Sequence, residues 1–308
     1  MDFVKLSNKT NKQKSYQIKN HPDHLIFIFA KLNLGMIDSH CHLEQKDYKK
    51  DLGKVLDICR KQLKAVVTCS ARPKDLEEAI GLVKENSGFV FAAAGLHPEF
   101  IKEIKEKEKD DFLEAVKQNK KHIVGFGEVG LDYKWVQEAH WQEKQKEQFK
   151  EMIGFSKEIK KPLVVHSRGA CADAVKILED QDAKQVLLHM FAESKLMPSV
   201  VENNWLVSIN LLVTRSKDYK KVAKEAPLEN ICLETDAPWN GVQKPLAEVA
   251  PTDIVFKENK EQGFATLRND PTTIKITAEK IAEIKGLPFE KVWSVCGDNA
   301  KRFYGLDV

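Results

Sequence analysis

Short apolar runs alternate with amphipathic stretches along most of this chain, starting at Met36. The apolar runs are rich in valine, leucine and isoleucine and nearly continuous, which is typical of strands buried on both faces. The stretches between them repeat apolar residues at three- and four-residue steps, as in 74–86, 141–160 and 170–180, and this spacing predicts helices. Eight strands are predicted, at residues 36–39, 65–69, 89–94, 123–127, 163–165, 186–188, 206–209 and 231–233.

Strands that alternate with helices favour a parallel sheet covered by helices, which is an α/β architecture. Eight units in succession favour a closed (β/α)8 TIM barrel over an open sheet. No glycine-rich loop follows the first strand, which argues against a dinucleotide fold or a P-loop. After the eighth strand we expect a long loop at about 240–271, and then two helices within 271–286 and 288–305.

Charge and composition divide the chain into two parts. It has 308 residues and a net charge of +3, but residues 1–35 alone carry six lysines against Asp2 and Asp23, so the remainder carries −1. We predict that 1–35 is a poorly ordered N-terminal extension and that 36–308 is the barrel domain. A nearly neutral domain does not indicate nucleic-acid binding by bulk charge.

The sequence shows neither a recognisable targeting signal nor closely spaced cysteine pairs. The apolar run at 25–30 is too short to span a bilayer, and no secretory signal is recognisable. The six cysteines form no CxxC pair, so we expect reduced thiols in a cytoplasmic protein, with a nuclear location left open for a eukaryotic source.

Polar residues follow the strands where each one ends. In a (β/α)8 barrel these carboxyl ends meet at one mouth, where catalysis occurs in this architecture. Accidental placement of so many polar residues there is the weaker interpretation, although each has a structural alternative. The residues at the predicted strand ends are His40, His42, His97, Glu128, Asp132, His166, Arg168, His189, Glu234 and Asp236.

The stretch "GMIDSHCHLE" (35–44) shows the chemistry these positions allow. In an extended strand His40 and His42 point to the same face and Cys41 to the other. Alone, the pair suits a metal ion or a hydrogen-bonded strand end equally well. Together with the later histidines and carboxylates it suits two divalent ions, Zn, Mg or Mn, and metal-assisted hydrolysis by an activated water. Asp236 could move that water's proton.

Five motifs in this order, "IDSHCHL", "GEVGLDY", "PLVVHSR", "LLHMF" and "ICLETDAPW", resemble the TatD family of metal-dependent deoxyribonucleases, which are amidohydrolase-like TIM barrels. The stretches "RNDP" (268–271) and "GDNAKRFYG" (297–305) resemble the family's closing motifs. The resemblance implies that His40, His42, Glu128 and Asp236 hold one metal. It also implies that Glu128 bridges to a second metal held by His166 and His189.

A TatD-type hydrolase is expected to be an exonuclease acting on DNA 3′ ends or single strands. A single strand suits the narrow barrel mouth and the near-neutral domain, with His97, Arg168, Arg268 and Lys134 as candidate substrate contacts. An ester or amide hydrolase such as a D-aminoacyl-tRNA deacylase is the alternative, and a non-catalytic binding module is a third. We expect no membrane association and a monomer or small homo-oligomer.

Three loops depart from the family pattern. Glu99 stands where a second histidine commonly follows the His-Pro of strand three, and "HMFAES" lacks the glycine of the usual turn after strand six. The stretch after Asp236 is also unusual. We therefore expect an intact metal site beside an altered substrate pocket.

Overall fold

The computed structural model describes residues 35–250 and 252–308. Eight parallel strands form one sheet in the order β1 to β8, each paired with the next along the chain. The strands are β1 (Ile37–Cys41), β2 (Ala65–Ser70), β3 (Val90–Ala94), β4 (Ile123–Gly130), β5 (Leu163–His166), β6 (Val186–Leu188), β7 (Leu206–Ile209) and β8 (Ile231–Leu233). The eight predicted strands are confirmed, and the main difference is that β4 runs three residues past its predicted end.

The sheet curls into a nearly closed barrel, because residues just beyond β8 hydrogen-bond to β1. The His42 amide donates to the Ala237 carbonyl (2.7 Å), and the Asp236 amide donates to the His40 carbonyl (3.0 Å). The buried Asp38 carboxylate adds to this closure by accepting from the Thr235 amide at 3.0 Å. The predicted (β/α)8 barrel is confirmed.

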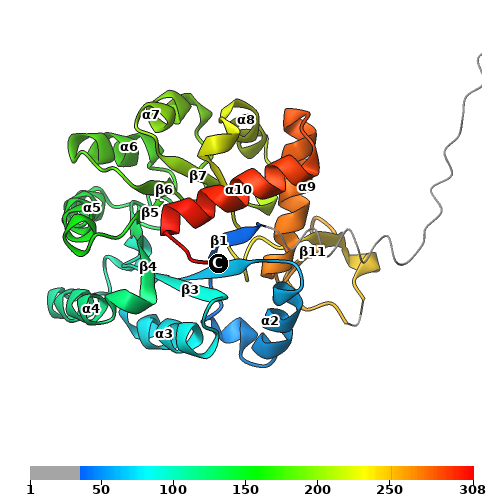
Figure 1. Ribbon diagram of the computed structural model, residues 1–308, viewed down its shortest axis with the longest axis horizontal. Helices are drawn as coiled ribbons and strands as arrows, with labels where there is room; N and C mark the ends of the chain where they lie inside the picture. The colour runs from blue at the N-terminus through cyan, green and yellow to red at the C-terminus, as the bar shows by residue number, and fades with distance from the viewer. Residues whose placement is uncertain (1–34, 251) are drawn as a thin grey trace, which may run out of the picture.

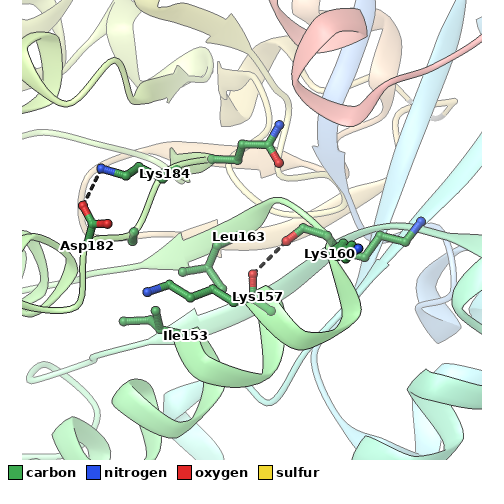
Figure 2. Close-up of a pocket in the computed structure, with 10 residues that line it drawn as sticks. Ile153, Lys157, Lys160, Leu163, Asp182 and Lys184 are labelled. Atoms are coloured by element: carbon green, nitrogen blue, oxygen red, sulfur yellow. Dashed lines mark hydrogen bonds and ion pairs between the residues drawn. The ribbon is translucent and has the colours of Figure 1, made fainter.

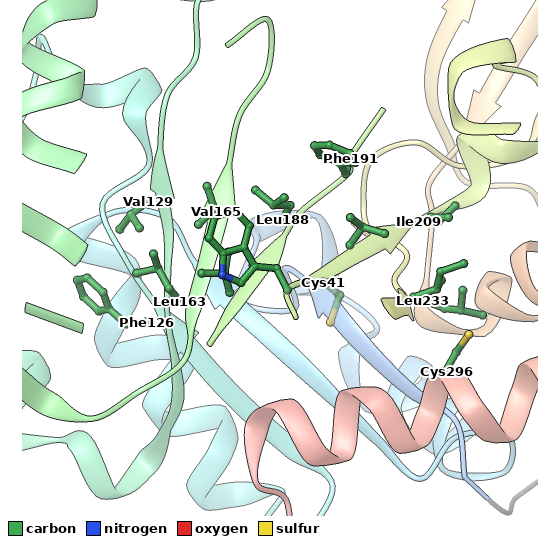
Figure 3. Close-up of a cluster of buried hydrophobic side chains, with 14 of the residues drawn as sticks. Cys41, Phe126, Val129, Leu163, Val165, Leu188, Phe191, Ile209, Leu233 and Cys296 are labelled. Carbon is green, nitrogen blue, oxygen red and sulfur yellow. The ribbon is translucent and has the colours of Figure 1, made fainter. Parts of the chain in front are cut away.

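Helices surround the barrel (Figure 1). They pack against the sheet through a continuous apolar layer that includes Val129, Val165, Leu188 and Leu233 (Figure 3). The helices are α2 (Leu52–Arg60), α3 (Leu76–Glu85), α4 (Glu106–Gln118), α5 (Ala139–Ile159), α6 (Cys171–Asp180), α7 (Met197–Glu202), α8 (Lys217–Glu225), α9 (Ile274–Lys285) and α10 (Phe289–Tyr304).

A second apolar cluster fills the barrel interior. Side chains from the strands, such as Val67 and Val164, meet Phe303 and Tyr304 from the last turn of α10. Helix α10 crosses the barrel in Figure 1, and Asn299 on it hydrogen-bonds to the Ile231 carbonyl at the start of β8. The amino end of the barrel is therefore packed with apolar side chains, which leaves the carboxyl end for polar chemistry.

The predicted loop at 240–271 is wrong in part. It contains a three-stranded antiparallel sheet of β9 (Gln243–Pro245), β10 (Val255–Asn259) and β11 (Phe264–Leu267), in the order β10-β11-β9. Between β10 and β11 the chain turns through Gly263, whose φ of +71° favours glycine. The strands are only three to five residues long, and β9 and β10 are mostly exposed, so they lack the long buried apolar runs that predict the barrel strands.

Of the predicted N-terminal extension, residues 1–34 lie outside the described residues, so its order and the boundary at Met36 stay predictions. All six cysteines are free, as expected. Within the described part of the chain, no helix has the length and apolar character needed to cross a membrane.

Candidate metal centre

Six of the predicted side chains converge at the carboxyl end of the barrel. They come from five different strands or the residues that follow them, and five of the six are buried, with exposed fractions of 0 to 7%. His166 is slightly more open. The six residues are His40, His42, Glu128, His166, His189 and Asp236.

His40, His42, Glu128 and Asp236 form the first half of this cluster. The Nε2 atoms of His40 and His42 lie 3.1 Å apart. Oε1 of Glu128 lies 3.1 Å from His40 Nε2 and 3.4 Å from His42 Nε2. Oδ1 of Asp236 lies 3.5 Å from His42 Nε2 and 3.9 Å from His40 Nε2. Two imidazole nitrogens and two carboxylate oxygens thus face one point.

The other oxygen of Glu128 faces the second half of the cluster. Oε2 lies 3.3 Å from His166 Nδ1, 3.6 Å from His189 Nε2 and 3.7 Å from His97 Nε2. His97 was predicted only as a substrate contact, yet its Nε2 is 3.2 Å from His166 Nδ1. Glu128 is therefore shared between the two halves, and His97 belongs with the second.

Local backbone irregularities help to aim these side chains. The pairing of β1 with β2 shifts between Asp38 and Cys41, and the pairing of β4 with β5 shifts between Phe126 and Val129. Such irregularities re-aim side chains next to active sites. Cys41 lies in the apolar layer outside the barrel, where its Sγ contacts the Val67 carbonyl. The predicted alternation of His40, Cys41 and His42 is confirmed.

Asp236 has a left-handed backbone, with φ of +56°, which is unusual for a residue other than glycine. The hydrogen bond from its amide to His40 holds this conformation, and its carbonyl accepts from the Trp239 amide. Asn240 donates to Oδ2 of Asp236 at 2.6 Å. One oxygen of Asp236 is thus fixed by Asn240 while the other faces the histidines.

Three more carboxylates stand behind the histidines. Oε2 of Glu234 lies 2.9 Å from His189 Nδ1, Oδ2 of Asp132 lies 2.8 Å from His166 Nε2, and Oε1 of Glu44 lies 3.4 Å from His42 Nδ1. A carboxylate on the far nitrogen fixes the ring orientation of a metal-binding histidine. The sequence placed Asp132 and Glu234 at strand ends but gave them no role, and it did not single out Glu44.

Electrostatics in the cluster favour charged carboxylates. Burial favours the neutral form of Glu128, but the charges of His40 and His189 outweigh it and hold its pKa well below the ordinary value. Burial lowers the pKa of His189, yet Glu234 and Glu128 outweigh this effect and raise the pKa to about 9. Burial, reinforced by His166, lowers the pKa of His97 to about 3.

The donor set fits divalent cations. Five buried carboxylates, Glu44, Glu128, Asp132, Glu234 and Asp236, surround the histidines. Three sets of donors converge within 4.8 Å: His40 with His42 and Glu128, His40 with His189 and Asp236, and His97 with Glu128 and His166. Imidazole nitrogen and carboxylate oxygen are the ligands of Zn²⁺ and related ions.

Comparison with known proteins agrees with this geometry. Residues 37–305 match the model of the family described as TatD related DNase. The chain belongs to the TatD family. The TatD relatives include the putative deoxyribonuclease TATDN3 of Mus musculus, 31% identical over 89% of each chain, and the metal-dependent hydrolase YabD of Bacillus subtilis, 30% identical over 88% of this chain and all of the relative.

Solved structures share the TatD fold. A hydrolase TatD family protein from Entamoeba histolytica superposes with a TM-score of 0.76 at 20% identity, covering 89% of this chain and 99% of the other. The TatD homologue YJJV of Escherichia coli gives 0.75 at 20% identity, covering 88% and 98%. The sequence-based prediction of a TatD-type, metal-dependent hydrolase is confirmed.

The two arginines predicted as substrate contacts of this TatD protein have different surroundings. Arg168 is exposed on the loop after β5, and its guanidinium lies over the Trp135 ring. Arg268 follows β11 and hydrogen-bonds to both carboxylate oxygens of Asp51 at 2.8 and 2.7 Å and to the Asp47 carbonyl at 2.7 Å. These three bonds hold the guanidinium against Asp47 and Asp51, so we assign Arg268 a structural role, and its contact with substrate stays an untested prediction.

A hollow of about 400 Å³ is lined by several lysines, some of which are drawn in Figure 2. It is bordered by Lys157, Lys160, Lys161 and Lys184, at the amino ends of β5 and β6. The side chains of the metal centre stand at the carboxyl ends of the same strands. These lysines therefore lie at the opposite end of the barrel and are not placed to hold a phosphate at the centre.

Proposed function

We propose that this protein is a deoxyribonuclease that hydrolyses phosphodiester bonds at DNA 3′ ends or in single strands, using two divalent ions. His40, His42, Glu128 and Asp236 would hold one ion. Glu128, His166 and His189 would hold the other, with His97 beside them. Zn, Mn or Mg would suit these ligands.

The observation that carries the proposal is the position of Glu128. Its two oxygens face two different groups of imidazoles, at 3.1 Å from His40 and at 3.3 Å from His166. A carboxylate shared in this way suits a pair of neighbouring cations. When bound, two such ions supply Lewis acidity and lower the pKa of water, which is the chemistry that hydrolysis of a phosphodiester needs.

The chain's own residues orient this centre and handle the proton. Glu234 and Asp132 hold the far nitrogens of His189 and His166, so that the other nitrogens face the centre. Asp236 keeps Oδ1 on the centre while Asn240 fixes Oδ2. With Oδ2 held by Asn240 and Oδ1 directed at the centre, Asp236 is placed to accept a proton from a water bound there.

DNA is the proposed polymer because the TATDN3 relatives of mouse and man are named as deoxyribonucleases. A single strand or a frayed end is favoured because residues 36–308 carry a net charge of about −1, which gives little bulk attraction for a duplex. The predicted monomer or small homo-oligomer and the cytoplasmic location stay predictions.

Activity and metal content of the full-length chain test this proposal. The protein is stripped with a chelator, reloaded with Zn, Mn or Mg, and assayed on single- and double-stranded DNA, RNA, a model phosphodiester and a carboxylic ester. We expect two ions per chain by elemental analysis and cleavage of single-stranded DNA. Turnover of the ester alone would replace the nuclease with an ester hydrolase that uses the same centre.

Glu128→Gln is the decisive variant, because it keeps the shape of the side chain but removes the shared charge. We expect it to bind at most one ion and to lose about 100-fold or more of the activity. Glu85→Gln is the matched control, since Glu85 is an exposed glutamate at the end of the outer helix α3, on the side of the barrel away from the centre. Equal activity in Glu128→Gln and wild type would refute the proposed centre.

A further inference from the structure

Trp135 is unusually exposed for its size. Its exposed fraction is 61%, the highest among the large apolar side chains of the described residues. The residue lies on the loop between β4 and α5, at the carboxyl end of the barrel and therefore on the same face as the metal centre. An exposed indole ring contributes little apolar packing to the folded protein. Its place on the catalytic face therefore suggests that it binds a ligand.

Asp132 connects this tryptophan to the metal centre. Its Oδ1 accepts hydrogen bonds from the Lys134 and Trp135 amides, both at 2.8 Å, while its Oδ2 contacts His166 Nε2 at 2.8 Å. The Trp135 amide is thus less than about 8 Å from His166 Nε2, because the two oxygens of one carboxylate link them. The backbone of Trp135 is therefore fixed by the same carboxylate that contacts His166, a residue of the centre.

Arg168 extends this surface. Its guanidinium lies 5.7 Å from the centre of the Trp135 ring, a distance that allows a cation–π contact. The loops that carry the two residues are joined, because the Tyr133 amide donates to the Arg168 carbonyl at 3.0 Å. Arg168 is exposed and lies two residues after His166. An aromatic face and a cation therefore stand together beside the centre.

A docking surface for another protein is the competing explanation, and the surroundings of Trp135 argue against it. Protein interfaces need a contiguous apolar patch. The other exposed large apolar residues of the described chain lie on other segments, including Ile58 on α2, Val201 on α7 and Phe256 on β10. One isolated ring next to one guanidinium matches a flat aromatic ligand that carries negative charge.

We infer that Trp135 and Arg168 form a stacking platform for a nucleobase of the single-stranded substrate, with Arg168 also contacting a neighbouring phosphate. This inference rests on the proposed nuclease function and names two residues that determine its substrate class. Stacking of bases on aromatic side chains is tolerant of sequence and contributes about 1–3 kcal/mol per base. The platform would therefore favour strands with intact bases over abasic strands, without preferring a particular base sequence.

Kinetics on paired substrates test the platform. The metal-loaded full-length protein is assayed on a single-stranded oligonucleotide and on the same strand with abasic residues at its terminal positions. We expect Trp135→Ala to raise KM about ten-fold or more on the ordinary strand, to leave kcat nearly unchanged, and to have no effect on the abasic strand. Trp135→Phe should recover most of the lost affinity, and Arg168→Met should raise KM on both strands.

Ile58→Ala serves as the matched control, because Ile58 is also an exposed apolar residue but lies on the outer helix α2. If wild type cleaves no strand, the proposed function itself fails. If wild type cleaves and Trp135→Ala has the same KM as wild type on the ordinary strand, the platform alone fails. A change of oligomeric state in Trp135→Ala by light scattering, with KM unchanged, would instead make the ring a contact between protein chains.

Discussion

At the scale of single residues, the site depends on carboxylates that do not face its centre. Glu234 shows this most clearly: it contacts Nδ1 of His189, accepts from the Ser208 hydroxyl at 2.5 Å and accepts from the Met190 amide at 3.1 Å. These three contacts leave the carboxylate little freedom. The orientation of the His189 ring, and so the position of its Nε2, follows from that restraint.

Glu234→Gln should therefore weaken metal binding without removing a proposed ligand. We expect the affinity for Zn to fall about 10- to 100-fold, the usual effect of losing a carboxylate behind a metal-binding histidine. Competition with a chromogenic chelator measures this affinity, and Glu85→Gln is again the control. An unchanged affinity would mean that His189 is oriented by packing alone.

At the scale of elements, the small sheet β9–β11 is attached to the barrel through Arg268. The residue follows β11, and its two-pronged ion pair with Asp51 reaches the start of α2. The guanidinium also lies over the Tyr48 ring, 4.8 Å from its centre. Tyr48 in turn donates to the Asn269 carbonyl at 2.6 Å. These contacts join two loops that both leave the carboxyl end of the barrel.

Arg268→Met should lower the free energy of unfolding by about 1–3 kcal/mol, because it leaves Asp51 and the Asp47 carbonyl without a donor. Arg268→Lys should lose less of this free energy.

The hydrogen bond from Arg268 holds the pKa of Asp51 below its ordinary value of 3.8. The stabilisation is therefore present above the pKa of Asp51 in the unfolded chain and is lost as pH falls through the lower folded value. Chemical denaturation should show wild type and Arg268→Met converging in acid, and a constant difference would contradict this account.

At the scale of the whole molecule, the proposed ligands come from strands at both ends of the domain sequence. His40 lies in β1 and Asp236 follows β8, while Glu128, His166 and His189 come from between them. A cation bound there would join five strand ends and bind only the folded barrel. Ligands that bind only the native state stabilise it by mass action.

Removal of metal should therefore lower the thermal stability. Each ion at a free concentration 100 times its Kd adds about 2.7 kcal/mol, which corresponds to several degrees in Tm for a domain of this size. Thermal unfolding with and without a chelator measures the change, and Glu128→Gln should show a much smaller response. Equal Tm values for protein shown to be metal-loaded and metal-free would contradict the proposed ligand set.

The barrel and the residues at its mouth could be predicted from the amino-acid order, because both follow from local periodicity. A strand buried on both faces has a nearly continuous run of apolar residues. The residue that follows such a strand lies at the carboxyl end of the barrel, whatever the strand's position in the sheet. That is why His40, Glu128 and Asp236 could be grouped before any contact was known.

The contacts between individual atoms of the site depend on the three-dimensional fold. The pairing of Glu234 with His189, of Asp132 with both His166 and the Trp135 amide, and of Arg268 with Asp51 joins segments far apart along the chain or depends on the path of one loop. Apolar periodicity carries no information about which oxygen faces which nitrogen. The same limit applies to β9–β11, which are short and of which β9 and β10 are mostly exposed, so no recognisable apolar period marks them.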